Sequence, residues 1–206
     1  MKLHHRLIEL VVAMSVVVIS LASLFVAVYQ GIVMDRTMKA SVMPVVQVDS
    51  GNIDDDRETW VMTINVKNTG LGPAEIRYFN MYWNGEIIRD TSALMARCCL
   101  PETVPADERL PYVYDAFRDG QLSLVFDNVQ RRFLAPQEDI DYIAFDRPDA
   151  DTQPRGRALW DALDDVRHDI TYEVCYCSVF DDCWRARFPE HSREPVRQCV
   201  GPDEAR

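Results

Sequence analysis

The chain has 206 residues, of which 48% are hydrophobic, and carries 33 acidic against 22 basic side chains, for a formal net charge of −11. Such an acidic surface repels nucleic-acid phosphates and anionic lipid headgroups, which argues against DNA or RNA binding. All six cysteines lie after residue 97, and an even number in this context is typical of disulfides in an oxidising compartment.

The segment that organises the chain is the uncharged run of residues 10–33, LVVAMSVVVISLASLFVAVYQGIV. Its 24 residues give about 36 Å of helix, enough to cross a hydrocarbon core of about 30 Å. A cleaved secretory signal has a shorter apolar core and a small-x-small cleavage site, which this run lacks. We therefore predict an uncleaved signal anchor. A buried core helix is the alternative, but soluble helices rarely extend this far without a charge.

Flanking charges and the cysteines together predict the orientation of the anchor. Lys2, Arg6 and the amino terminus precede the run, whereas Arg36 and Lys39 follow it, so the positive-inside rule gives only a small bias. Because the cysteines require an oxidising compartment, we expect residues 1–9 in the cytoplasm and the rest of the chain in the periplasm. The bilayer in question is then the bacterial inner membrane.

The anchor is the first of four predicted parts downstream of the amino terminus. Residues 34–44 are expected to form a stalk, residues 45–199 a β-sandwich ectodomain and residues 200–206 a disordered tail. The roughly 170 residues after the anchor suit a single domain with its own core.

Short strands and turns dominate the first half of this domain. Residues 45–48 predict a strand, and the acidic triplet 54–56 predicts a solvated loop, since it lacks the ligand pattern of an EF-hand. Residues 59–67 alternate clearly and place one apolar face inward. This face comprises Trp60, Met62, Ile64 and Val66.

The next strand, residues 74–83, slips in phase between Ile76 and Phe79, which predicts a β-bulge. Asn84-Gly85 predicts a type I′ hairpin that returns through residues 86–88.

The run TINVKNTGLGPAEI followed by YWNGE resembles the CARDB-like and fibronectin-III-like modules of bacterial envelope proteins. The resemblance covers residues 59–88 and consists of strand and turn chemistry. It implies an Ig-like antiparallel β-sandwich and a role in adhesion, scaffolding or partner binding, with no catalytic residues to carry over. The longer, more helical segment after Ile88 departs from these modules.

The second half mixes helices and strands. We predict helices at residues 91–99 and 158–167, a strand at 122–126 and a hairpin of residues 131–134 with 139–145. Residues 106–120 are ambiguous. Residues 170–184 predict a strand, an Asp-Asp turn and a returning strand, apolar on both faces and hence central in the sheet. The chain beyond Pro189 is expected to be irregular. The fold class is therefore mainly β, with one transmembrane helix and short helical insertions.

All six cysteines are disulfide candidates: Cys98, Cys99, Cys175, Cys177, Cys183 and Cys199. Neighbours on one strand face are about 6.6 Å apart, at the limit of a disulfide, so a Cys175–Cys177 bond is disfavoured. We also disfavour Cys98–Cys99, as too close and wrongly aimed. Cys177 with Cys183 across the hairpin is preferred, and Cys199 is expected to bind either Cys175 or the Cys98-Cys99 helix.

The chemical alternative is a metal or thiol-redox site on the hairpin of residues 175–183, with His168 or His191 nearby. The Cys-x-Cys spacing fits neither zinc nor thioredoxin motifs. Asp164-Asp165 and Asp181-Asp182 are better explained as a helix face and a turn than as a hydrolase acid and base. We thus predict no catalytic residues, no metal ligands and no cofactor.

The sequence favours a non-enzymatic membrane-anchored protein that binds or scaffolds within an envelope complex. Its expected partners are the lipid bilayer, through residues 10–33, and other membrane or envelope proteins. One alternative is the metal-handling or redox protein above. Another is an accessory subunit whose anchor packs in a larger membrane assembly, since small residues would let a partner helix approach. These are Ala13, Ser20, Ala22, Ser23 and Ala27.

Overall fold

A computed structural model describes residues 2–54 and 58–201. The chain divides into two compact units, Met1–Val42 and Met43–Arg206. Asp55 and Asp56 of the acidic triplet, and residues 202–206 of the expected tail, lie outside the described residues.

The first unit is one continuous helix, α1 (Lys2–Ser41), of 40 residues. Its segment Ile8–Ser41 is long and apolar enough to span a membrane, and none of its most apolar stretch is buried by the rest of the chain. The helix continues through residues 34–41, where the sequence suggested a stalk, since that stretch has no glycine or proline before Pro44. An ion pair between Lys39 and Asp35 at 3.8 Å, one turn apart, supports this end of the helix.

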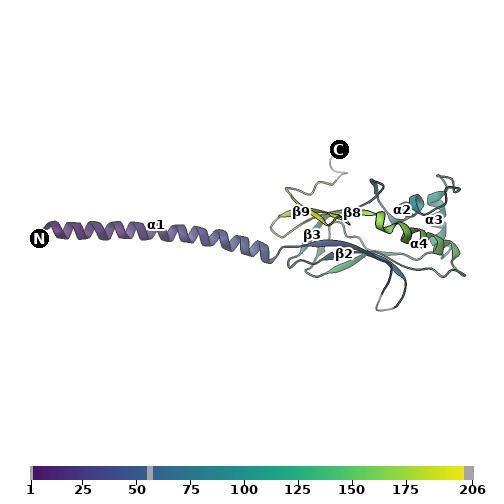
Figure 1. The fold of residues 1–206 in the computed structure, drawn as a ribbon, viewed down its shortest axis with the longest axis horizontal. Coiled ribbons are helices and arrows are strands. Elements are labelled where there is room, and N and C mark those ends of the chain that lie inside the picture. The colour runs from purple at the N-terminus through teal and green to yellow at the C-terminus, as the bar shows by residue number, and fades with distance from the viewer. Residues whose placement is uncertain (1, 55–57, 202–206) are drawn as a thin grey trace. The chain divides into compact units, whose positions relative to one another are not determined.

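The second unit is mostly β and contains two antiparallel sheets of four and six strands (Figure 1). The first sheet has the order β1 (Val46–Gly51), β2 (Val61–Asn68), β7 (Asp139–Asp146), β5 (Val125–Phe126). The second has the order β10 (Ser192–Val196), β9 (Cys183–Phe188), β8 (Thr171–Cys177), β3 (Ala74–Trp83), β4 (Glu86–Ile88), with β6 (Phe133–Leu134) also paired to β3.

Three helices gather at one end of this unit: α2 (Thr91–Cys98), α3 (Arg109–Arg118) and α4 (Pro154–Val166), the last followed by the 3₁₀ turn η1 (Arg167–Asp169) (Figure 1). The sequence predicts Asp90 or Thr91 as the cap of this helix. The cap of α2 is Asp90, which accepts a 2.8 Å hydrogen bond from the Ala93 amide. Arg109 of α3 donates to carbonyls at the end of α2, including Ala96 at 3.2 Å and Pro101 at 2.9 Å. This guanidinium therefore joins the two helices.

The core lies between the inner faces of the sheets, as the alternation in the sequence indicates. Val66, Ile76, Val174 and Tyr176 are all fully buried there. β8 is buried along six of its seven residues and lies between β3 and β9, which confirms its predicted central position. Trp60 is an exception to the predicted apolar face: it is 47% exposed and lies against the Arg147 guanidinium instead.

Turn chemistry is predicted well. Trp83 pairs with Glu86 across Asn84 and Gly85, both of which have positive φ, so the two-residue hairpin is confirmed. The register shift between Ile76 and Tyr78 confirms the bulge.

The predicted hairpin of residues 131–134 with 139–145 is wrong, because its two strands belong to different sheets. β6 pairs with β3, whereas β7 pairs with β2 and β5. The amide of Arg131 donates to Ile76 at 2.8 Å, and the Ile76 amide donates to Arg132 at 2.8 Å, so this segment adds to β3. The turn that follows carries the chain from one sheet to the other.

Other elements differ from the sequence prediction in their bounds or presence. The helix α4 begins at Pro154 rather than at residue 158, and β1 extends to Gly51 rather than to residue 48. β5 covers only Val125–Phe126 rather than residues 122–126, and both its side chains are exposed. The chain beyond Pro189 forms the edge strand β10, paired antiparallel with β9, where we expected irregular structure. Its largely exposed, charged side chains give no alternation signal.

Asn68, at the end of β2, joins three segments through its side chain and is fully buried. Its Oδ1 accepts from the amides of Val45 at 3.2 Å and Gly70 at 3.0 Å. Its Nδ2 donates to the carbonyls of Gly72, Leu134 and Ala135 at 2.8 to 3.3 Å. A Cβ on Gly70 would lie 2.4 Å from the Val45 nitrogen, so this close approach requires glycine.

We predict that Asn68→Ala lowers the free energy of unfolding by about 2 to 4 kcal/mol, because it leaves several buried backbone groups without partners. Chemical denaturation of the full chain in detergent micelles, followed by near-ultraviolet circular dichroism, measures this. Asn65→Ala is the matched control on the same strand. Asn65 makes one exposed 3.3 Å hydrogen bond to Asp141, so its loss should cost less than about 0.5 kcal/mol. Equal losses for the two variants would contradict the role of Asn68.

Candidate functional site

The most unusual chemistry lies on the outer face of the second sheet. In β8, Tyr172, Val174 and Tyr176 belong to the core, so the alternation of side chains places Cys175 and Cys177 on the opposite face. Both are only 1% exposed. The segment that follows β10 reaches them, since Cys199 bonds to Cys175.

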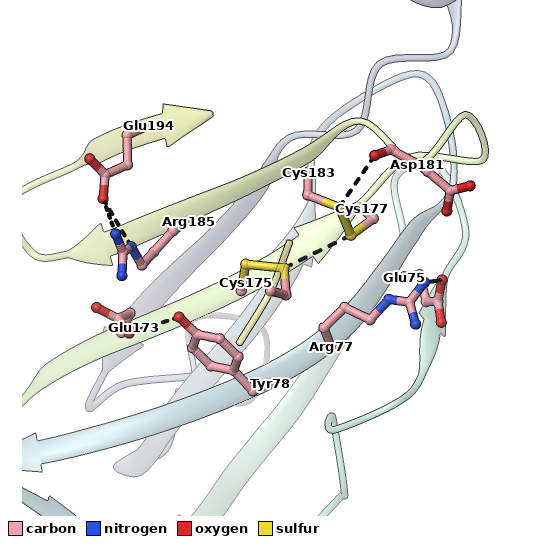
Figure 2. The surroundings of a disulfide bond; sticks show 11 residues. Glu75, Arg77, Tyr78, Glu173, Cys175, Cys177, Asp181, Cys183, Arg185 and Glu194 are labelled. Atoms are coloured by element: carbon pink, nitrogen blue, oxygen red, sulfur yellow. Dashed lines mark hydrogen bonds and ion pairs between the residues drawn. A yellow bond between two sulfur atoms is a disulfide. The ribbon is translucent and has the colours of Figure 1, made fainter. Parts of the chain in front are cut away.

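Two disulfides lie side by side here (Figure 2). Cys177 bonds to Cys183 across the β8–β9 hairpin, as the sequence predicts, with Cα atoms 4.0 Å apart. Cys175 bonds to Cys199, with Cα atoms 5.7 Å apart, which is one of the two options left open for Cys199. The Sγ atoms of Cys177 and Cys199 are 3.8 Å apart although they belong to different disulfides.

The third disulfide joins Cys98 to Cys99, so our prediction against this bond is wrong. That prediction rested on the Cα separation of adjacent residues, 3.7 Å here, which is below the usual range for disulfides. Cys99, however, lies past the last helical residue of α2, with φ −116° and ψ 6°. The helix therefore does not fix the direction of its side chain. None of the six cysteines is free.

Next to the cysteines, Glu173 is a carboxylate that is 8% exposed. It accepts hydrogen bonds from the Tyr78 hydroxyl at 2.9 Å and from the Arg187 guanidinium at 2.8 Å. Burial, and then the hydrogen bond to the Glu173 carboxylate, raise the pKa of Tyr78 above its ordinary value. Arg185, two residues before Arg187 in β9, pairs with Glu194 of β10 at 2.7 Å. Apart from its charged residues, nothing in the sequence indicates this polar row.

An open groove of about 320 Å³ lies on this face, at the other end of β8 from the hairpin turn. Its charged lining consists of Glu173, Arg187 and Glu190, and Tyr82 and Thr171 add hydroxyl groups. A groove with this lining suits a binding partner whose surface is polar or charged.

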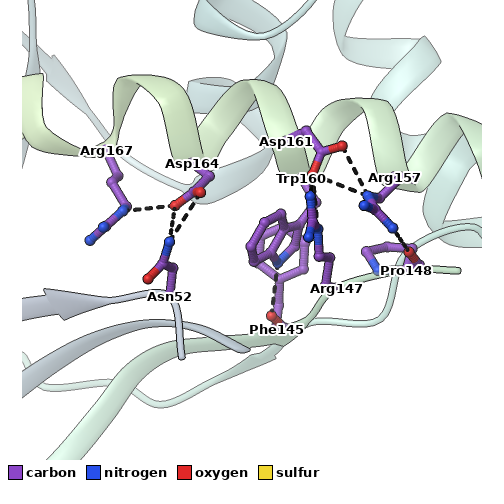
Figure 3. A network of polar contacts seen from close by, with 9 residues as sticks. All are labelled: Asn52, Phe145, Arg147, Pro148, Arg157, Trp160, Asp161, Asp164 and Arg167. Carbon is purple, nitrogen blue, oxygen red and sulfur yellow. Dashed lines mark hydrogen bonds and ion pairs between the residues drawn. The ribbon is translucent and has the colours of Figure 1, made fainter. Parts of the chain in front are cut away.

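Two acidic residues of α4, Asp161 and Asp164, make structural contacts (Figure 3). Asp164 accepts from Asn52 at 3.1 Å and from Arg167 at 2.8 Å. Asp161 pairs with Arg147 at 2.7 Å and with Arg157 at 2.9 Å. Burial by itself would raise the pKa of Asp161, but the hydrogen bonds from these two guanidinium groups lower it below its usual range.

Arg147 also connects α4 to the first sheet. Its guanidinium carbon lies 4.9 Å from the ring centre of Trp160 and 5.2 Å from that of Trp60. The Trp160 indole donates a 3.1 Å hydrogen bond to the Phe145 carbonyl in β7. These contacts fix the helix against the sheet.

The two histidines of the second unit do not join the cysteines. His168 and His191 line a separate cavity of about 110 Å³ with Asp49 and Arg167. Among the described residues, one group of three metal-ligating side chains has its donor atoms within 4.8 Å of one another: Cys177, Cys183 and Cys199. Cys199 is far from the other two in the sequence, and no sequence motif indicates that it joins them.

Comparison with known proteins gives no relative: no family model, no curated protein and no solved structure matches this chain.

We predict that the free energy of unfolding falls as the pH rises above about 10, and falls less steeply in Tyr78→Phe. The raised pKa of Tyr78 means that the unfolded chain releases this proton first, so alkaline pH favours unfolding. At neutral pH the lost hydrogen bond should cost about 1 kcal/mol. Denaturation at several pH values measures both effects. Tyr114→Phe, at a 48% exposed position on α3, should leave the neutral-pH value unchanged. An unaltered alkaline slope in Tyr78→Phe would contradict the prediction.

Proposed function

We propose that this protein is a non-enzymatic, single-pass membrane protein whose disulfide-stabilised ectodomain binds or scaffolds partners in a bacterial envelope complex. In this proposal the amino terminus is cytoplasmic, the anchor lies in the inner membrane and the second unit is periplasmic.

The observation that carries the proposal is the uncovered apolar surface of α1. Val16, Ile19 and Phe25 are 57%, 64% and 82% exposed, and among the described residues none of the most apolar stretch of α1 is buried. Exposure of so much apolar surface to water is unfavourable, at about 25 cal/mol per Å². Lipid, or another apolar helix, is the surrounding that such a helix needs.

Strand order supports an Ig-like sandwich for the second unit. The order β1-β2-β7-β5 corresponds to strands A-B-E-D of that fold, and β9-β8-β3-β4 corresponds to G-F-C-C′. The disulfides differ from the antibody pattern, which links strands B and F across the core. Here they link β8 to β9 and β8 to the tail. Domains of this kind expose sheet faces and loops for binding, and the groove beside Glu173 is our candidate surface.

Labelling in spheroplasts tests the membrane topology. Leu71 is 70% exposed, and the native cysteines are all bonded, so Leu71→Cys should react with a membrane-impermeant maleimide added outside. Lys2→Cys is the matched control and should react only after permeabilisation. If Leu71→Cys reacts only after permeabilisation, the proposed topology is wrong.

Affinity purification tests the binding role. We expect a stoichiometric partner to co-purify from mild detergent, and Thr171→Arg with Glu190→Arg in the groove to reduce its recovery at least tenfold. Both positions are exposed, so folding should be preserved. Glu102→Arg with Thr103→Arg, at two positions that are also exposed, is the charge-matched control. A partnerless monomer would contradict the binding role. Capture that survives the groove changes but is lost when residues 10–33 are replaced by polyleucine would favour the accessory-subunit alternative.

A further inference from the structure

Four sulfur atoms converge on the outer face of the second sheet. Cys175 and Cys177 come from β8, Cys183 from β9 and Cys199 from the segment after β10. The sulfur atoms of Cys177, Cys183 and Cys199 lie within 4.8 Å of one another, and Cys175 is bonded to Cys199. The pairing seen here is the oxidised form of this cluster, and its reduced form contains four thiols in the same place.

We propose that reduction converts these two disulfides into a tetrathiolate site for one zinc-class divalent cation. Two equivalents of an external dithiol reduce the two disulfides to four thiols and are themselves oxidised to two disulfides. The cation then forms four metal–sulfur bonds and displaces four protons, which pass to solvent. This site goes beyond the binding role proposed above and does not depend on it.

The sheet keeps most of this site in place without the disulfides. Cys177 faces Cys183 in the β8–β9 ladder, and Cys175 lies two residues along the same face of β8. Backbone hydrogen bonds maintain this register, and the core side chains of β8 lie on the other face. The sheet therefore preorganises Cys177 and Cys183. The Cys175 sulfur lies outside the group that falls within 4.8 Å and has to turn toward it along the same face of β8, and Cys199 comes from irregular chain.

The spacing suits tetrahedral thiolate coordination. Zinc–sulfur bonds of about 2.3 Å place the sulfur atoms of a tetrahedral site about 3.8 Å apart. The Cys177 and Cys199 sulfurs already have this separation, 3.8 Å. Each bonded pair has to open to the same separation once reduced. Zinc favours four cysteine ligands in structural sites, whereas harder cations such as Mg²⁺ prefer oxygen.

The surroundings suit the charge of such a site. Four thiolates around a divalent cation carry a net charge of −2, and Arg185 lies opposite Cys175 in the ladder. Its charge is shared with Glu194, at 2.7 Å. Cys199 is partly exposed, which gives the reductant and the cation access to the cluster. Disulfides and metal exclude each other, because both use the same sulfur atoms.

The test uses the full chain in detergent micelles. Peptide mapping first establishes the disulfides, and a phosphine then reduces the protein under inert gas before removal of the reductant. Titration with Co²⁺, a spectroscopic substitute for Zn²⁺, should give one cation per chain, with the visible bands of tetrahedral cobalt and a thiolate charge-transfer band. Zn²⁺ should abolish both. The oxidised chain should show no charge-transfer band.

Variants assign the ligands. Cys199→Ser and Cys177→Ser should each weaken Co²⁺ binding at least tenfold, whereas Cys98→Ser with Cys99→Ser should bind like the parent chain. Near-ultraviolet circular dichroism establishes that each reduced protein is folded. Cys199→Ser changes only the segment after β10, so this variant is used if Cys177→Ser unfolds. Folded, reduced chain without stoichiometric binding, or binding unaffected by Cys199→Ser, overturns the proposal.

Discussion

The fold of the second unit depends on the amide of Asn68, which is buried where the two sheets approach each other. Its five hydrogen bonds join the start of β1, the turn after β2 and the turn that leads from β6 to β7. All five bonds go to backbone groups, and the amide of Gly70 and the carbonyl of Gly72 belong to buried residues, where a missing hydrogen bond is costly. One side chain therefore supplies hydrogen-bond partners to backbone groups at three places in the irregular chain, where strand pairing does not supply them.

The strand β8 contributes side chains both to the core and to the outer face of the second sheet. Its inward aromatic residues fill the core between the sheets, and its outward residues supply Glu173 and two of the four clustered sulfurs. Along this strand only the first residue, Thr171, is exposed. The candidate chemistry is thus attached directly to a buried, central strand, and sites built on strands are held more precisely than sites on loops.

Local signals predict much of this architecture, and long-range pairing explains the failures. The Asn84-Gly85 turn, the Asp90 cap and the Ile76 bulge each follow from a few adjacent residues, and each is confirmed. By contrast, Leu134 and Ile140 are close in sequence but belong to different sheets. No local pattern reveals that β6 bonds to β3. The same limit applies to the site: Cys177–Cys183 is a hairpin contact and predictable, whereas the position of Cys199 beside Cys177 depends on the path of the tail.

The unbroken helix through Ser41 has a mechanical consequence for the proposed anchor. Only residues 42–45 separate the end of α1 from the start of β1. A helix of 40 residues is about 60 Å long, roughly twice the thickness of the hydrocarbon core. Part of it must then continue beyond the lipid or tilt strongly. For the proposed anchor, the chain between the lipid and the second unit would then consist of helix and residues 42–45, so its length would be set by the helical rise of about 1.5 Å per residue rather than by a long linker.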